Sequence, residues 1–325
     1  MKKLFLIISI VIIAGSVFVG CEKEDISSKS YLGKYEIREF ENLEQLFKEI
    51  DYVNSLDYDQ LVEYEKSLNF NSFGKIANEL LDNLSEDTTI IFDHLQKIIN
   101  ENSNFLMINP IEDEYNLDIK YCSTPFLYIM NSDRMFIVDN YIYKVFDTCL
   151  VKSFIENYDK LLQLKDKDIQ NLGESFSVIP QPKISSNNAT TVDFIQKEKI
   201  NGKEKVIASL RCVVLDKDTA NGQTFKYSSI ILDIRGYRKF ANIWWPVKRH
   251  LSNNLASTIS SYGYPVNYSS NCGSNTGCTW GRNRTVTICR KADIVPSDAN
   301  LSYYIKDAFG YAKIPAAKID FDYVQ

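Results

Sequence analysis

The chain changes both its hydrophobic period and its charge near residue 175. Residues 31–174 carry 28 acidic and 13 basic side chains, a formal charge of −15, whereas residues 175–325 carry 11 acidic and 20 basic ones, a formal charge of +9. A single hydrophobic core stops growing beyond roughly 250–300 residues, and this chain has 325. We therefore expect an acidic domain over residues 33–175 and a basic domain over residues 176–325.

The acidic half has the spacing of amphipathic helices. Asn42 and Ser72, two helix-capping residues, each precede apolar side chains that recur at helical intervals. The apolar residues between positions 151 and 162 recur in the same way and predict another helix. Asp139-Asn140 separates two short apolar runs and predicts a hairpin turn.

The basic half instead has the alternation of β-strands. Val206, Ala208, Leu210 and Cys212 lie two residues apart, and Asn201-Gly202 separates two such runs. The fold class that follows is α+β: a mainly helical N-terminal domain with a small hairpin, then an antiparallel β-rich sandwich or partly closed barrel.

The first twenty residues have the layout of a secretory signal peptide. Two lysines precede an apolar stretch over residues 4–19, and Gly20-Cys21 follows it. A cysteine directly after a small residue resembles the lipobox of bacterial lipoproteins. That resemblance implies cleavage before Cys21 and its lipidation by acyl chains such as palmitate, which makes the membrane a partner and residues 21–32 a tether. An uncleaved signal anchor is the alternative.

The residues after this cysteine carry a second resemblance. Cys21-Glu22-Lys23-Glu24-Asp25 is similar to the C-x-K-(D/E)-(D/E) export signal of Bacteroidetes surface lipoproteins. Lys23, Glu24 and Asp25 would then direct the chain to the outer membrane, lipid-anchored and facing the cell exterior. The alternative is an ordinary acidic tether that faces the periplasm.

Six cysteines remain when Cys21 is set aside, and in an exported chain they permit three disulfides in 15 connectivities. Three pairings suggest themselves: Cys272 with Cys278 across a short glycine-containing loop, Cys122 with Cys149, and Cys212 with Cys289. The cysteine spacing does not fit zinc, and we expect neither a metal nor another cofactor.

The sequence offers little for catalysis. It has 2 histidines and lacks the nucleophile elbow, the phosphate-binding glycine loop and the zinc-protease helix. Its densest carboxylates are Glu112, Asp113, Glu114 and Asp118, which keep a glycosidase-like hydrolase open as an alternative. We expect the protein not to be an enzyme.

Basic and aromatic residues alternate in one segment of the second half. The members are Arg235, Tyr237, Arg238, Lys239, Trp244, Trp245, Lys248 and Arg249. Such a mixture binds anionic glycans through charge and ring stacking. Two alternatives stay open: the tryptophans belong to a core, and the bases face solvent or the acidic half.

Three stretches resemble a family of uncharacterised Bacteroidetes lipoproteins: residues 64–73, residues 139–146 and Ile243-Trp244-Trp245. The family has no assigned activity, so the resemblance implies no functional residue. The sequence thus predicts a surface-exposed lipoprotein that binds an anionic glycan or an envelope component and does not meet nucleic acid. The alternatives are a carboxylate-dependent hydrolase and a scaffold subunit of an envelope complex.

Overall fold

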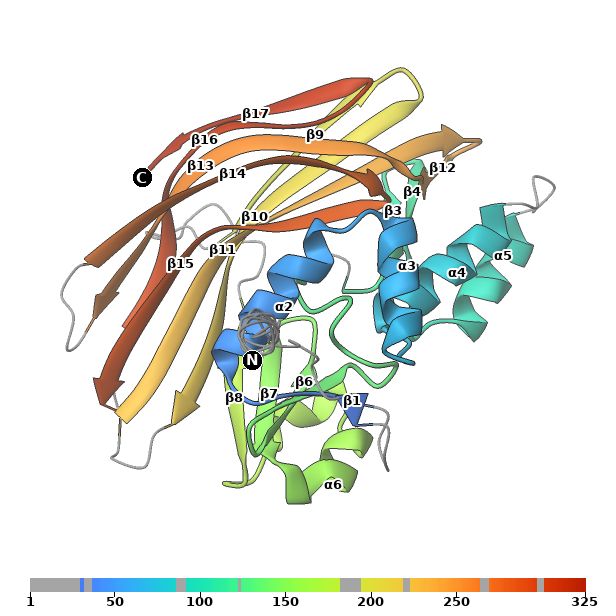
Figure 1. The fold of residues 1–325 in the computed structure, drawn as a ribbon. Coiled ribbons are helices and arrows are strands. Elements are labelled where there is room, and N and C mark those ends of the chain that lie inside the picture. The colour runs from blue at the N-terminus through green and yellow to red at the C-terminus, as the bar shows by residue number, and fades with distance from the viewer. Residues whose placement is uncertain are drawn as a thin grey trace, which may run out of the picture.

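The structure, a computed structural model, describes residues 30–31, 37–85, 92–121, 124–181, 194–218, 223–263, 269–296 and 301–325. It is 56% strand and 24% helix, and its elements form three sheets. The expected α+β class with a mainly helical N-terminal domain is therefore wrong. Residues 33–175 contain strands of two sheets as well as helices (Figure 1).

Four of the helices follow one another in the first third of the chain. They are α2 (Leu43–Ser55), α3 (Tyr58–Ser67), α4 (Phe73–Ser85) and α5 (Phe92–Glu101). The two predicted caps are confirmed: the Asn42 side chain accepts from Gln45 N at 2.9 Å, and the Ser72 hydroxyl accepts from Lys75 N at 3.0 Å.

The first sheet lies in the part of the chain where a mainly helical domain was expected. Its order is β1-β2-β5-β6-β7-β8. The strands are β1 (Ser30–Tyr31), β2 (Ile37–Phe40), β5 (Met135–Val138), β6 (Tyr141–Val145), β7 (Cys149–Phe154) and β8 (Phe176–Pro180). The predicted hairpin at Asp139-Asn140 is confirmed, because Val138 pairs with Tyr141.

The helix predicted over residues 151–162 is only partly formed. Its first residues belong to β7, and a short 3₁₀ turn, η1 (Ile155–Asn157), leads into α6 (Tyr158–Gln163). A second 3₁₀ segment, η2 (Asp166–Asn171), follows. Strand β7 is buried from Cys149 to Ser153, because α6 covers one face of the first sheet and the long helices cover the other. A strand buried on both faces has no alternation, so its apolar run also fits a helical spacing.

The second sheet has the order β3-β4-β12-β11-β10-β9. Strand β15 also pairs with β11, along residues 223–235, whereas β12 pairs with its residues 237–240. Its strands are β3 (Leu106–Ile111), β4 (Glu114–Ile119), β9 (Phe194–Asn201), β10 (Glu204–Asp218), β11 (Gln223–Phe240), β12 (Ile243–Pro246) and β15 (Asn283–Pro296). Glu112 and Asp113, two of the dense carboxylates, form the turn between β3 and β4.

The third sheet has the order β14-β13-β16-β17. Its strands are β13 (Arg249–Gly263), β14 (Ser269–Gly281), β16 (Leu301–Ile314) and β17 (Ala317–Val324). Inward side chains of this sheet pack against those of β10, β11 and β15 in one apolar core. The long strands arc over the helices in Figure 1.

Two sheets cross the boundary expected at residue 175. The β3–β4 hairpin belongs to the acidic half, yet β4 pairs in parallel with β12 of the basic half. Strand β8 begins after the boundary and pairs with β7 before it. The two halves are therefore interlocked through their sheets. In the part of the chain that the structure describes, no helix is long and apolar enough to cross a membrane.

Candidate functional site

The predicted basic and aromatic cluster does not form one open surface. Arg235, Tyr237 and Lys239 alternate along β11 and point to the same face of the second sheet, whereas the Arg238 side chain points away and is 64% exposed. Tyr237 and Trp244 are buried, and Trp245 is half-buried against the large core. The aromatic residues therefore belong to the interior.

Most bases of this cluster are neutralised by carboxylates. Lys239 pairs with Glu114, and an Nη1 atom of Arg235 lies 3.4 Å from Asp118 Oδ2. The remaining pairs are Lys248 with Asp82 at 3.1 Å and Arg249 with Glu204 at 2.9 Å. Glu114, Asp118 and Asp82 all come from the acidic half, so the cluster mainly joins the two halves.

Strand β4 supplies a polar ladder to this junction. Glu114, Asn116 and Asp118 lie two residues apart and therefore share one face. Glu114 contacts Lys239 and also accepts from the Trp244 indole N–H. Asn116 accepts from Lys205 Nζ, and Asp118 accepts from Tyr237 Oη at 2.6 Å.

Burial changes the proton affinity of two groups beside this ladder. Desolvation lowers the pKa of Lys205 to about 8, although its ammonium lies 4.6 Å from the centre of the Trp244 ring. Desolvation raises the pKa of Asp233 to about 6, against the opposing effect of Arg235, whose Nε lies 2.9 Å from Asp233 Oδ2. The protonation state of each of these groups therefore depends on its burial and on the charges beside it.

A cavity of about 610 Å³ lies over this polar face. Its floor comes from the second sheet, and the turn between β6 and β7 contributes Phe146, Asp147 and Thr148 on another side. The polar lining residues are Asn109, Asn116, Asp118, Thr124, Asp147, Thr148, Gln181, Gln196, Arg211 and Arg235. The aromatic ones are Tyr121, Phe126, Phe146 and Phe194. We call this space the junction cavity.

Several lining side chains are held in place by the protein. The Gln181 amide donates to Val214 O at 2.9 Å, and the Arg211 guanidinium lies 5.4 Å from the centre of the Phe194 ring. Tyr121 Oη accepts from Arg134, and burial raises the pKa of Tyr121 to about 12. Burial, followed by the charge of Asp166, also raises the pKa of Asp147. The cavity is therefore preorganised and polar on one side.

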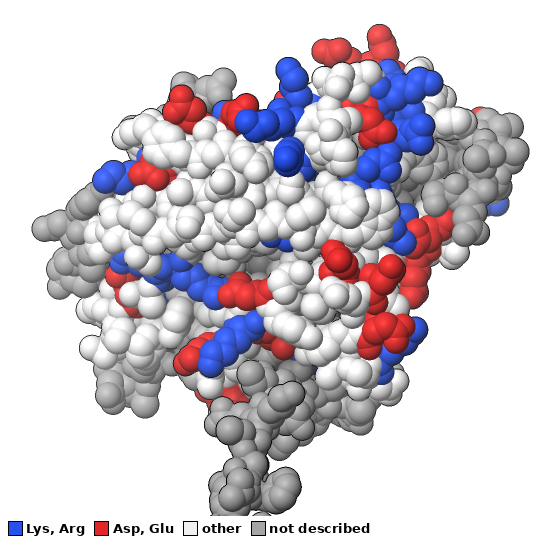
Figure 2. Space-filling view, turned by 45° about the horizontal axis from the view of Figure 1, so that its top comes forward, with Lys and Arg blue, Asp and Glu red and all other residues white. Residues whose placement is uncertain are grey.

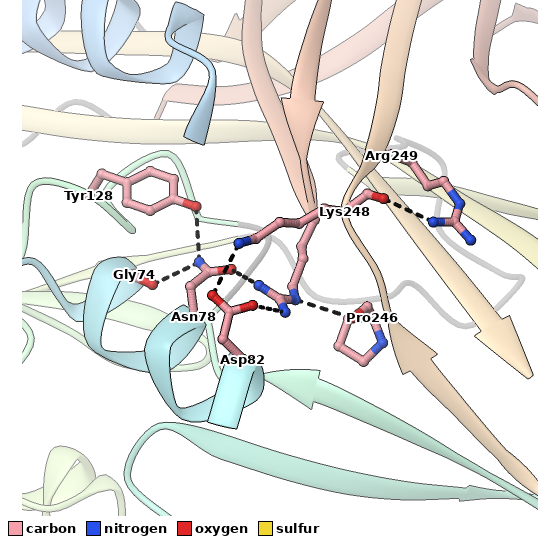
Figure 3. Close-up of polar contacts among 8 residues, drawn as sticks. Gly74, Asn78, Asp82, Tyr128, Pro246, Lys248 and Arg249 are labelled. Carbon is pink, nitrogen blue, oxygen red and sulfur yellow. Dashed lines mark hydrogen bonds and ion pairs between the residues drawn. The ribbon is translucent and has the colours of Figure 1, made fainter. Parts of the chain in front are cut away.

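A second polar contact between the halves lies on α4. Asp82 accepts from Lys248 and from Arg282, whose Nη2 is 2.6 Å from Asp82 Oδ1. Arg282 Nη1 also donates to Asn78 Oδ1 at 3.1 Å. Figure 3 shows Asn78 and Asp82 side by side on the helix, with Lys248 reaching toward them and Tyr128 alongside. This contact joins α4 to Lys248, between β12 and β13, and to Arg282, between β14 and β15.

The cysteines do not lie as two of the predicted pairs require. Cys272 and Cys278 are six residues apart on the extended strand β14, a span of roughly 20 Å. Cys212 and Cys289 lie on β10 and β15, both opposite Ile230 of the intervening β11, so about 10 Å separates their backbones. Both spans exceed the roughly 7 Å that a disulfide bridges. Cys149 is buried, and its predicted partner Cys122 lies outside the described residues.

Other predictions fall outside the described part of the chain. Cys21, Lys23, Glu24 and Asp25 lie there, so lipidation and export stay predictions. Within the described ranges no group of three or more His, Cys, Asp or Glu side chains is arranged to hold a metal ion.

Sequence reasoning missed Lys205, Arg211 and Gln181. The available signal was a charge within an apolar strand, since Arg211 stands between Leu210 and Cys212.

Comparison with known proteins gives little. No protein-family profile and no curated protein matches the sequence. A crystal structure of a DUF4848 family protein from Bacteroides thetaiotaomicron is similar over 86% of this chain and 90% of that one, with 13% identity and a TM-score of 0.28. The variable domain of the Streptococcus agalactiae AgI/II polypeptide BspA is similar over 50% of this chain and 91% of that one, with 8% identity and a TM-score of 0.15. Neither likeness carries an argument about this protein's site.

Proposed function

We propose that this protein is a lipid-anchored outer-membrane protein, displayed on the cell surface, that binds the acidic end of a glycan without transforming it. The proposal rests on the side chains that line the junction cavity. There the guanidinium groups of Arg211 and Arg235, several amides and four aromatic rings surround one space.

The size and chemistry of the cavity suit such a ligand. A volume of about 610 Å³ lies within the range of small-molecule sites, about 300–1,000 Å³. Aromatic rings pack against the C–H faces of sugars, while amides exchange hydrogen bonds with hydroxyl groups. A guanidinium group binds a carboxylate with two parallel hydrogen bonds, so Arg211 would receive the acidic group of the sugar.

Arg211 is a better candidate for this role than Arg235. Arg235 lies between Asp118 and Asp233 and offsets their charges. Arg211 lies on β10, which β12 and β11 separate from β4, and packs over Phe194 at the other side of the cavity. Its charge acts on Asp233 less than that of Arg235 does. A ligand carboxylate at Arg211 would leave the Asp118–Tyr237 hydrogen bond intact.

Calorimetry with oligosaccharides of galacturonic or glucuronic acid tests the proposal. Arg211→Gln should weaken binding at least tenfold, because a charge-assisted hydrogen bond contributes about 1.5–3 kcal/mol. The matched control is Arg238→Gln, whose side chain points away from the cavity and is mostly exposed. Absence of binding by the unaltered protein, or equal affinity of a folded Arg211→Gln variant, would contradict the proposal.

The cellular location is tested separately. Labelling with a palmitate analogue should mark the wild-type protein and not Cys21→Ala. Protease added to intact cells should degrade the wild-type protein, whereas replacing Lys23, Glu24 and Asp25 by alanine should protect it. Protection of the wild-type protein would place it on the periplasmic side.

One observation favours a second function, glycoside hydrolysis. Asp118 and Asp147 both line the junction cavity, and their surroundings differ. Asp118 accepts from Tyr237 and pairs with Arg235, whereas burial raises the pKa of Asp147. In glycosidases the carboxyl group with the raised pKa acts as the general acid, and the ionised carboxylate acts as the base or nucleophile. Release of reducing sugar that disappears in Asp147→Asn, with binding retained, would establish this activity and overturn a purely binding role.

A further inference from the structure

One long segment of the chain carries no formal charge. From His250 to Gly281 there is no Asp, Glu, Lys or Arg, although these residues make up 24% of the protein. The segment forms β13 and β14, which pair from Arg249–Gly281 to Ser261–Ser269. A protein surface normally carries charges of both signs for solubility, so an uncharged hairpin of this length requires a reason.

The uncharged face of this hairpin is exposed. Leu251, Leu255 and Ile259 of β13 point into the core. Asn253 and Ser257 lie on the same inward side and are buried, so the even-numbered residues between them point outward. The exposed outward residues are Asn254 and Ala256 on β13 and Ser270, Cys272, Ser274, Thr276 and Cys278 on β14. We call them the neutral face. A broad white area without charged side chains crosses this side of the molecule in Figure 2.

Hydroxyl and amide groups along this hairpin are fixed by contacts between its strands. Thr276 Oγ1 donates to Asn254 Oδ1 at 3.1 Å, and the hydroxyls of Ser260 and Ser270 lie 2.7 Å apart. Outward residues of one strand repeat about every 6.8 Å, since each residue advances the strand by about 3.4 Å. The face thus presents regularly spaced hydrogen-bonding groups.

Aromatic rings stand at both ends of the neutral face. Trp280 lies 4.9 Å from His250 between ring centres and is 37% exposed. At the opposite end Tyr262 packs edge-on against Tyr304 at 5.8 Å and is 41% exposed. Rings of this kind offer flat apolar surfaces beside the hydroxyl and amide groups.

We propose that the neutral face binds an uncharged polysaccharide chain. Its hydroxyl and amide groups match the hydroxyls of such a chain, and its terminal rings suit the C–H faces of sugar rings. A strongly charged partner would gain no opposite charge here and would lose part of its hydration. The extended hairpin also suits a linear chain better than a compact ligand.

This site is separate from the junction cavity. The neutral face belongs to the third sheet, whereas the cavity lies on the second sheet, on the face turned away from the core that the two sheets share. The proposal therefore does not depend on the acidic-glycan site, and each site has its own variants.

Affinity electrophoresis of the whole soluble portion, with Cys21 removed, tests the proposal. The gels contain laminarin, mannan, xylan or dextran as neutral probes and dextran sulfate as a charged one. We expect at least one neutral polysaccharide to slow the migration of the protein. Any retardation by dextran sulfate should not depend on the residues of the neutral face. Thr276→Glu and Ser274→Glu should each weaken retardation at least tenfold. The matched control is Ser177→Glu, on the exposed edge strand β8.

The native cysteines supply a second readout. Cys272 and Cys278 are exposed on the neutral face, while Cys289 is buried and serves as an internal reference. The retained polysaccharide should slow alkylation of the two exposed thiols by iodoacetamide. Retardation by none of the four neutral probes, or retardation unchanged in both folded glutamate variants, would overturn the proposal. A dimer that these variants dissociate would overturn it too, since the face would then bind a second copy.

Discussion

Arg282 Nη2 donates to Asp82 Oδ1 at 2.6 Å, joining a side chain of the basic half to one of the acidic half. Arg290 makes a similar connection to Asp51 of α2, where Nη1 lies 2.6 Å from Oδ2. Together with the pairs of Lys239 and Lys248, these contacts use the opposite charges of the two halves within one molecule. The charge asymmetry of the sequence is thus largely an intramolecular attraction.

Asp82→Asn should destabilise the protein. Arg282 is almost fully buried, so the change leaves its guanidinium without an opposite charge, while Lys248 loses its partner as well. We expect the free energy of unfolding to fall by about 2 kcal/mol, below the roughly 3–5 kcal/mol of a fully buried pair because Asp82 is partly exposed. Urea denaturation measures the loss. Glu79→Gln, an exposed change on the same helix, should stay within about 0.5 kcal/mol; equal losses would contradict the assignment.

Gly310→Ala should disrupt the third sheet. Gly310 has a φ of +132°, and a Cβ atom there would lie 2.0 Å from Asn254 O on the neighbouring strand β13. The strands would have to separate, so we expect a loss of more than about 3 kcal/mol. Gly173→Ala is the matched control, since a Cβ at Gly173 would meet nothing within 4 Å. Similar thermal midpoints for the two variants would disprove this packing.

The sequence predicted local structure better than architecture. The caps at Asn42 and Ser72 and the turn at Asp139-Asn140 were found because each depends on neighbouring residues. The two strands beside this turn, β5 and β6, were found with it, but the sheet around them was not. Strand β7 was missed because it is buried on both faces from Cys149 to Ser153, so it has no alternation to recognise. The pairing of β4 with β12 joins residues more than a hundred positions apart, which no local pattern encodes.

The candidate site was predicted only in part. The sequence identified Arg235, Tyr237 and Asp118 as notable, and the structure brings these three together. The sequence did not indicate that these three residues are buried together, because Asp118 is more than a hundred positions away from Arg235 and Tyr237. An exposed basic patch and an ion-paired junction have the same composition, and only the fold distinguishes them.

Lys144 should make stability rise with pH in alkaline solution. Its ammonium donates to the carbonyls of Leu161, Leu162 and Leu164 at the end of α6, and burial lowers its pKa to about 8. Between pH 8 and the unfolded value of about 10.4 the unfolded chain binds a proton that the folded one does not, so stability rises with pH. The free energy of unfolding of the wild-type protein, relative to that of Lys144→Met, should therefore rise by about 2 kcal/mol between pH 8 and 10.

Urea titrations of both proteins at several pH values measure this difference. Lys152→Met is a useful control, because Lys152 is also buried in the first sheet but lies over the Tyr141 ring. Parallel curves for wild type and Lys144→Met across this range would contradict the assigned role of Lys144.

Glu65 should have the opposite effect in acid. Its carboxylate is buried and accepts from Ser72 N at 3.0 Å and from the Ser72 hydroxyl at 2.6 Å, and desolvation outweighs these bonds and raises its pKa to about 7. Between about pH 4.5 and 7 the folded state binds a proton that the unfolded state releases, so this group's contribution to stability falls as pH rises. Glu65→Gln keeps the size of the side chain and cannot ionise. Relative to the wild type, its free energy of unfolding should rise by about 3 kcal/mol between pH 5 and 8. Glu63→Gln, exposed on the same helix α3, is the control and should show no pH-dependent difference from the wild type. A constant difference between Glu65→Gln and wild type would show that Glu65 is ionised throughout this range.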